Sequence, residues 1–298
     1  MRRLLLLLAF VVFGRCIGAD APPPPPASPP PPYDFAAPDA IFELPNRLQE
    51  ISGLTALDGA TLGAVQDEDG DLFVLSAATG EVLRRHDFGG DGDYEGVERV
   101  GEAVWVLRSD GRLYEATAWA EEKAGAGRHR AALHVSCDAE GFGYDEAGQR
   151  LLIACKEGAG RGYGGHRAIY AFGLRERSLQ RRPAYLIPLD SVAVRMGQSG
   201  FDAQLRRLAR PVADVSGFKP SALAVHPRTG RLWVLSSVQK AVVVLDRNGG
   251  IFAAWPLPER LNPQPEGLAF LPDGTLFIAN EGSGRRGTLL RFAYQPRL

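Results

Sequence analysis

The sequence predicts an all-β fold, a β-propeller with five blades favoured and six as the alternative. Glycine and proline are abundant, at 35 and 22 of 298 residues, which favours many turns and short strands over long helices. Five segments of the chain also resemble one another, and each has the pattern of strand, tight turn, strand, turn and strand. A repeat of about 40 to 45 residues with several strands is typical of a propeller blade. A helical repeat of that length would need long amphipathic stretches, which these segments lack.

The repeated segments give the blades in chain order. They begin at Ile51, Tyr94, Ala139, Pro220 and Pro265. Turns such as "DEAG", "PRTG" and "LPDG" separate strands that are rich in Val, Leu, Ile, Phe and Trp. Equivalent anchor positions, which lie 43, 45, 81 and 45 residues apart by subtraction, are Gly53, Gly96, Gly141, Ala222 and Gly267.

The interval of 81 residues departs from this period, so it holds either a degenerate sixth blade or an insertion. Its extra piece, "SVAVRMGQSGFDAQLRRLARPVADVSGF", carries Phe201, Leu205 and Leu208 at helical spacing beside several arginines. This pattern favours a short helix within a loop, and therefore five blades.

One strand-like segment stands outside the repeats. "DAIFELP", from Asp39 to Pro45, precedes the first repeat and has no hairpin partner nearby, whereas the last repeat supplies only three strands. We expect this segment to complete the last blade, because pairing the two ends of the chain closes the ring and removes an exposed strand edge.

The N-terminus predicts export. "MRRLLLLLAFVVFGRCIGADA" has a basic start, an apolar run and small residues near Ala19, so residues 1–19 are predicted to be a signal peptide or a retained membrane anchor. Lipidation at Cys16 is a further alternative, although Arg15 stands where a small residue is required. The expected location is the periplasm, the periplasmic face of the cell membrane, or the cell exterior.

A proline-rich linker is predicted for residues 20–37. Its core, "APPPPPASPPPP", lacks the apolar side chains of a packed core and should form a stiff polyproline II spacer. After it the composition becomes globular and stays so, which predicts a single propeller domain over residues 38–298.

The cysteines fit an exported protein. In an oxidising compartment Cys137 and Cys155 can form a disulfide, since the predicted hairpin brings them close together. The alternative is two small buried side chains.

Several runs of sequence carry a family resemblance: "EISGLT", "EGFGYDEAGQRLLIACKEG", "KPSALAVHPRTGRLWVLSS" and "PEGLAFLPDGTLFIANEG". Over most of residues 40–295 the chain resembles the SdiA-regulated (YjiK-like) family of bacterial envelope propellers; the segment 190–217 departs from that pattern. The resemblance implies a periplasmic or membrane-associated propeller with no established activity. The chain is more distantly similar to propeller phytases, esterase-like proteins and gluconolactonases.

A candidate ligand site follows from the propeller geometry. The first strand of each blade lines the central channel and the second runs antiparallel to it, so first-strand starts meet second-strand ends at one face of the ring. The first-strand starts supply Ser52, Glu95, Glu140, Ser221 and Glu266. The second-strand ends supply Asp67, Arg108, Lys156, Glu157, Ser236, Asn280 and Glu281.

The three glutamates of this set define a candidate metal site. Carboxylates that face one axis repel one another, and a hard cation such as Ca²⁺ between Glu95, Glu140 and Glu266 would relieve the repulsion. The alternative is a structural role, in which each glutamate accepts backbone hydrogen bonds or pairs with Arg108 or Lys156.

Composition and motifs narrow the function. The net charge of -1 provides no basic field for nucleic acid. The chain lacks the Gly-x-Ser-x-Gly elbow, the His-Glu-x-x-His pair and a cysteine quartet.

Two hypotheses about the function remain. The first is a binding or scaffold module of the envelope that takes a cation or small polar ligand at the channel mouth, with envelope proteins as further partners. The second is a metal-dependent hydrolase of phosphoesterase, esterase or lactonase type that uses the same carboxylates.

Overall fold

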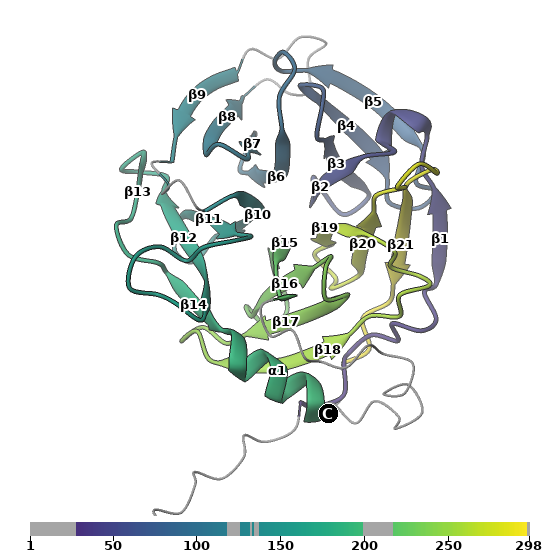
Figure 1. Cartoon of the computed structure of the whole chain (residues 1–298). Helices are drawn as coiled ribbons and strands as arrows, with labels where there is room; N and C mark the ends of the chain where they lie inside the picture. The colour runs from purple at the N-terminus through teal and green to yellow at the C-terminus, as the bar shows by residue number, and fades with distance from the viewer. Residues whose placement is uncertain (1–27, 118–125, 132, 134–136, 199–216, 297–298) are drawn as a thin grey trace, which may run out of the picture.

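The computed structural model describes residues 28–117, 126–131, 133, 137–198 and 217–296. Within this part of the chain, five antiparallel sheets are arranged around a central axis as the blades of a propeller (Figure 1). The predicted five-bladed fold is therefore confirmed.

The first three blades follow one another along the chain. The first blade contains β2 (Ile51–Ala56), β3 (Thr61–Gln66), β4 (Asp71–Ser76) and β5 (Val82–Asp87). The second contains β6 (Tyr94–Val100), β7 (Ala103–Arg108), β8 (Arg112–Ala116) and β9 (Ala126–Arg130). The third contains β10 (Ala139–Asp145), β11 (Arg150–Cys155) and β12 (His166–Gly173), and both β13 (Ser178–Leu179) and β14 (Tyr185–Pro188) pair with β12.

The last two blades complete the ring. The fourth contains β15 (Pro220–Val225), β16 (Leu232–Ser236), β17 (Ala241–Leu245) and β18 (Ile251–Pro256). The fifth contains β19 (Pro265–Phe270), β20 (Leu276–Asn280) and β21 (Thr288–Phe292), and it takes β1 (Ala40–Glu43) as its outer strand.

The fifth blade shows the predicted ring closure. β1 pairs antiparallel with β21, and Phe42 lies opposite Leu289 in the register. The chain then turns through a short 3₁₀ helix (Asn46–Leu48) into the first blade, and both Leu44 and Leu48 are fully buried. The two ends of the propeller thus share one sheet, and β1 covers the outer edge of β21, which would otherwise be unpaired.

The long interval between the third and fourth blades holds an insertion. α1 (Leu189–Gln198) packs Leu189 and Val192 into the core shared by these blades. The predicted helical residues Phe201, Leu205 and Leu208 lie outside the described residues.

The predicted linker ends earlier than residue 38. Tyr33 and Phe35 are buried in the core between the fourth and fifth blades. The indole Nε1 of Trp255 donates a hydrogen bond to the carbonyl of Pro29 at 2.7 Å, and the amide of Ala254 donates to Ser28 Oγ at 3.0 Å. Residues 28–37 are therefore part of the folded domain, and we call them the N-terminal strap.

Tyr33 ends in a buried chain of hydrogen bonds. Arg228 N donates to His226 Nδ1 at 3.1 Å, so the proton of the neutral imidazole is on Nε2. Nε2 then donates to the Tyr33 hydroxyl at 2.9 Å, and that hydroxyl donates to the carbonyl of Gly274 at 2.7 Å. Burial lowers the pKa of His226 to about 4, which keeps this chain intact at neutral pH.

The anchor glycines are explained by close approach of neighbouring blades. A Cβ atom on Gly53 would lie 2.8 Å from Gly96 Cα, and one on Gly96 would overlap Phe142 Cβ. A Cβ on Gly267 would lie 2.9 Å from Leu54 Cβ, across the seam between the fifth and first blades. The innermost strands are thus packed too closely for side chains at these positions.

The third blade contains a disulfide between Cys137 and Cys155, whose Cα atoms are 4.6 Å apart. Cys137 lies just before β10 and Cys155 ends β11, so the bond joins the entry of the innermost strand to the end of its neighbour.

Candidate functional site at the channel mouth

A β-bulge occurs at the same place in every innermost strand. In the first blade, Ile51 lies opposite Gln66 and Gly53 opposite Val65, so the residue between them has no partner. A bulge of this kind re-aims the extra side chain. The same shift recurs in all five blades. The bulged residues, which we call the mouth residues, are Ser52, Glu95, Glu140, Ser221 and Glu266.

The two serines among the mouth residues link neighbouring blades. Ser52 Oγ donates to the carbonyl of Tyr94 at 2.6 Å, and Ser221 Oγ donates to the carbonyl of Pro265 at 2.9 Å. Each acceptor is the first residue of the next innermost strand. Both hydroxyl groups donate their protons to the neighbouring blade and cannot donate them to a ligand. The glutamates are therefore the mouth residues that we expect to bind a ligand.

The three glutamates and Lys156 form one electrostatic cluster, which we call the mouth cluster. Lys156 Nζ contacts Glu140 Oε1 at 2.5 Å. Lys156 also lowers the pKa of both Glu95 and Glu266, so it is a cation that acts on all three carboxyl groups. Burial is the largest single influence on Lys156 and lowers its pKa. The hydrogen bond to Glu140 and the attraction of Glu140, Glu266 and Asp138 together outweigh burial and raise the pKa, which keeps the ammonium charged.

The carboxyl groups of the cluster hold their protons more tightly than exposed glutamates do. Burial, repulsion from Glu140 and a hydrogen bond with Asp93 raise the pKa of Glu95 to about 10. Burial and repulsion from Glu140 raise the pKa of Glu266 to about 7. Burial also raises the pKa of Glu140, against the opposing effect of Lys156. One ammonium group thus does not neutralise the three acids.

Two further groups near Glu266 were not predicted from the sequence. The Ser237 hydroxyl forms a hydrogen bond with Glu266 that stabilises its charged form. Lys240 lies close enough for Glu266 to raise its pKa, although burial has the larger effect and lowers it. Both residues follow β16: Ser237 comes directly after the predicted Ser236, and Lys240 comes four positions after Ser236. Extending each second-strand end by four residues would have found them.

A second acidic group lies where the first and last blades meet. Burial, Glu50 and then Glu281 raise the pKa of Asp67 to about 6, and its Oδ1 atom is buried without a hydrogen-bond partner among the described residues. Glu281 accepts a hydrogen bond from Gln264 Nε2. Asn280 is fully buried, and its Nδ2 donates to the carbonyl of Leu261 at 3.3 Å.

Three of the predicted site residues are turned to other partners. Arg108 lies near Asp110, with Nε to Oδ1 at 3.7 Å, and hydrogen bonds to Tyr114, away from the mouth cluster. Glu157 pairs with Lys219. Ser236 Oγ accepts the amide of Lys219 at 3.1 Å. The mouth cluster is therefore narrower than the set that the repeat pattern suggests.

The structure shows how the three glutamates of the predicted calcium site are arranged. Among the residues that the structure describes, no group of three or more histidine, cysteine, aspartate or glutamate side chains has a metal-binding arrangement. Lys156 lies among the carboxylates instead. Calcium binding by Glu95, Glu140 and Glu266 would require Lys156 to give up its contact with Glu140.

A buried acid at the opposite end of the channel was missed by the sequence reasoning. Glu98 is only 9% exposed and lines a cavity of about 130 Å³ with Thr55 and Tyr144. Thr55 Oγ1 donates to Glu98 Oε2 at 2.9 Å. Burial raises the pKa of Glu98 to about 8, against hydrogen bonds from Thr55 and from the Tyr144 and Arg99 amides. The signal was present, because the other repeats place only small residues or threonine three positions after the mouth residue.

Replacing Glu98 by glutamine should stabilise the protein in alkaline solution. The raised pKa means that the folded protein holds this proton more tightly than the unfolded chain does between about pH 4.5 and 8. The free energy of unfolding of the wild type therefore falls as the pH rises through that window. Glu98→Gln has no carboxyl group at this position, so its free energy of unfolding does not fall for this reason. We expect the variant to gain on the order of a few kcal/mol over wild type at pH 9 relative to pH 5.

Urea unfolding of both proteins at the two pH values measures this difference. Glu102→Gln, a change at an exposed glutamate of the same blade, serves as the control and should show no gain. If the free energies of unfolding of Glu98→Gln and wild type differed by the same amount at pH 5 and at pH 9, Glu98 would have an ordinary pKa.

Comparison with known proteins identifies the fold. No protein-family model matches the sequence, and no curated protein matches it. The structure is similar to glutaminyl cyclase from Myxococcus xanthus, with a TM-score of 0.56, 13% identity, and coverage of 86% of this chain and 95% of that one. It is also similar to a luciferin-regenerating enzyme, with a TM-score of 0.52, 11% identity and the same coverage of 86% and 95%.

A gluconolactonase from Xanthomonas campestris gives a TM-score of 0.46 and 16% identity, over 78% of this chain and 69% of that one. These neighbours are β-propellers, and similarity at such low identity concerns the fold alone. The chain is a five-bladed β-propeller whose mouth carries one buried glutamate, Glu140, and two half-buried ones, Glu95 and Glu266.

Proposed function

We propose that the chain is an exported binding propeller of the cell envelope, of the SdiA-regulated type. In this proposal the mouth cluster holds a cation, either Ca²⁺ or the ammonium group of a small polar ligand. One observation carries the proposal: after burial, repulsion from Glu140 is the next cause that raises the pKa of both Glu95 and Glu266, although Lys156 pairs with Glu140. A bound cation would relieve that repulsion, as it does wherever acids share a site.

The export part of the proposal rests on the N-terminal sequence. The basic start and apolar run of residues 1–19 have the character of a signal peptide. A disulfide between Cys137 and Cys155 fits an oxidising compartment. No helix within the described residues is long and apolar enough to cross a membrane.

The raised pKa values give the proposed site a distinctive pH dependence. At pH 7 the Glu95 carboxyl is protonated and Glu266 is close to half-protonated. A cation binds the ionised forms, so it must displace these protons, and its affinity should rise with pH. An ammonium ligand needs fewer ionised acids than Ca²⁺ does, because a protonated carboxyl group still accepts a hydrogen bond through its carbonyl oxygen.

Thermal melting tests the proposal. Wild type should melt at a higher temperature in the presence of CaCl₂ or of an alkylamine salt, since a ligand at 100 times its Kd stabilises a protein by about 2.7 kcal/mol. The triple variant Glu95→Gln, Glu140→Gln, Glu266→Gln should lose this shift, and Glu102→Gln should keep it. A response to calcium alone identifies a metal site, and a response to amines alone identifies an organic cation. A wild-type melting temperature that no cation raises would refute the proposal.

A hydrolase is the second candidate, because Glu266, with a pKa of about 7 and close to the ammonium of Lys156, suits proton transfer near neutral pH. A screen of phosphate ester, ester and lactone substrates with and without Ca²⁺ tests it. Activity that disappears in the triple variant would support catalysis at the mouth cluster. Activity that survives would place the chemistry elsewhere.

A further inference from the structure

A second cavity lies on the face of the propeller opposite the mouth cluster, at the seam between the fifth and the first blade. Its volume is about 570 Å³, within the range of small-molecule pockets. The β2–β3 turn, the residues after β4, the β19–β20 turn and the end of β21 surround it. These turns follow the far ends of the innermost strands, so this seam groove is separate from the mouth cluster.

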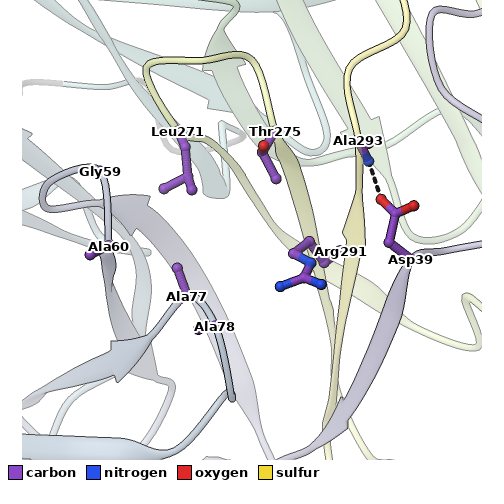
Figure 2. A pocket seen from close by; sticks show the side chains of 9 residues that line it. All are labelled: Asp39, Gly59, Ala60, Ala77, Ala78, Leu271, Thr275, Arg291 and Ala293. Carbon is purple, nitrogen blue, oxygen red and sulfur yellow. Dashed lines mark hydrogen bonds between the residues drawn. The ribbon is translucent and has the colours of Figure 1, made fainter.

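Small side chains create the space in the seam groove. On the first-blade side it is lined by Gly59, Ala60, Ala77 and Ala78, and on the closing-blade side by Leu271 (Figure 2). A Cβ atom placed on Gly59 would have no heavy atom within 4 Å. The groove is thus an open, mainly apolar surface between two blades, which can cover the apolar body of a small molecule.

One cation faces this surface. The guanidinium of Arg291, from β21, points into the groove in Figure 2. Within the described residues it makes no ion pair, and its aromatic neighbour is the Phe42 ring, whose centroid is 5.8 Å from Cζ. A guanidinium group presents paired donors that match the two oxygens of a carboxylate.

The nearby acid is engaged elsewhere. The Asp39 carboxylate accepts a hydrogen bond from the amide of Ala293, and the Asp39 amide donates to the carbonyl of Arg291 at 2.8 Å. Asp39 therefore joins β1 to β21, and it lies on the Ala293 side of the groove in Figure 2. Thr275, on the β19–β20 turn of the same blade, adds a hydroxyl group that can donate to an anion.

We propose that the seam groove binds a small organic carboxylate with a short apolar body, whose carboxylate pairs with Arg291 and whose apolar part covers the alanines of the first blade. Such a ligand would contact both the first and the closing blade. It would therefore stabilise the closed ring as well as occupy the groove.

Ligand-observed NMR titration of the full chain tests this inference, with hexanoate and benzoate as probes. We expect Arg291→Gln to weaken hexanoate binding at least tenfold. Arg286→Gln should leave it unchanged, because Arg286 belongs to the same blade but pairs with Glu43 outside the groove. Gly59→Phe, which places a bulky side chain at the groove lining and leaves Arg291 in place, should also weaken binding and remains informative if Arg291→Gln folds poorly.

Four results would overturn the inference. Hexanamide that binds as tightly as hexanoate would show that the groove is only an apolar surface. Inorganic phosphate that binds as tightly as hexanoate would show that Arg291 attracts any anion and that the apolar wall contributes nothing. Equal binding of hexanoate to wild type and Gly59→Phe, or no binding of either acid to wild type, would place no carboxylate in the groove.

Discussion

A chain that starts at residue 47 should fail to form the propeller. It lacks the N-terminal strap and β1, so it loses the buried side chains Tyr33, Phe35 and Leu44 and leaves β21 as an open edge. Removing a large buried side chain costs about 2 to 5 kcal/mol, and three such losses together are comparable to the whole stability of a typical domain, about 5 to 15 kcal/mol. Circular dichroism should show no cooperative thermal transition.

Two longer chains separate the contributions to this effect. A chain that starts at residue 28 keeps every described contact and should melt as the full chain does. A chain that starts at residue 38 keeps β1 but loses Tyr33 and Phe35, and it should melt at a clearly lower temperature. If the chain from residue 47 melted like the full chain, closure by β1 would contribute nothing to stability.

A single methyl group at Gly96 should destabilise the ring strongly. Glycine to alanine within a strand is ordinarily favourable by roughly 0.5 to 1 kcal/mol, because alanine loses less conformational entropy on folding. At position 96, however, the new Cβ would overlap Phe142 Cβ in the next innermost strand. Overpacking of this kind costs about 1 to 3 kcal/mol or more, so the clash outweighs the entropic gain and the net effect is destabilising.

Urea unfolding of Gly96→Ala beside Gly59→Ala measures the effect. Gly59 has open space around the position of a Cβ atom, so its replacement should leave stability nearly unchanged. If Gly96→Ala proved as stable as wild type, the innermost strands would not be in the close contact described above.

The sequence predicted the architecture because the repeat has a direct physical cause. Four of the five anchor positions are glycine and the fifth is alanine, and at Gly53, Gly96 and Gly267 the neighbouring innermost strand leaves no room for a side chain. The spacing of these small residues therefore reports the number of blades. The closing strand was predictable for a similar reason, since the last repeat was one strand short. The strap was not predictable, because its core partners, such as His226, are 193 positions away from Tyr33 and its composition resembles that of a spacer.

The site was predictable in position but not in chemistry. The repeat placed the mouth residues correctly relative to one another, because one bulge recurs in each innermost strand. It did not show that the serine hydroxyls donate to the next blade, or that Arg108 turns toward Asp110. These outcomes depend on local hydrogen bonds that vary between blades while the period stays constant.

Proton release on binding tests the central claim about the mouth cluster most directly. CaCl₂ or an alkylamine salt is added to lightly buffered wild-type protein at pH 7, and the liberated protons are measured by back-titration. The raised pKa values of Glu95 and Glu266 predict that protons leave as the cation binds. The triple glutamine variant should release none. A wild-type protein that releases no protons on adding either cation, or a triple variant that releases as many as wild type, would contradict the account.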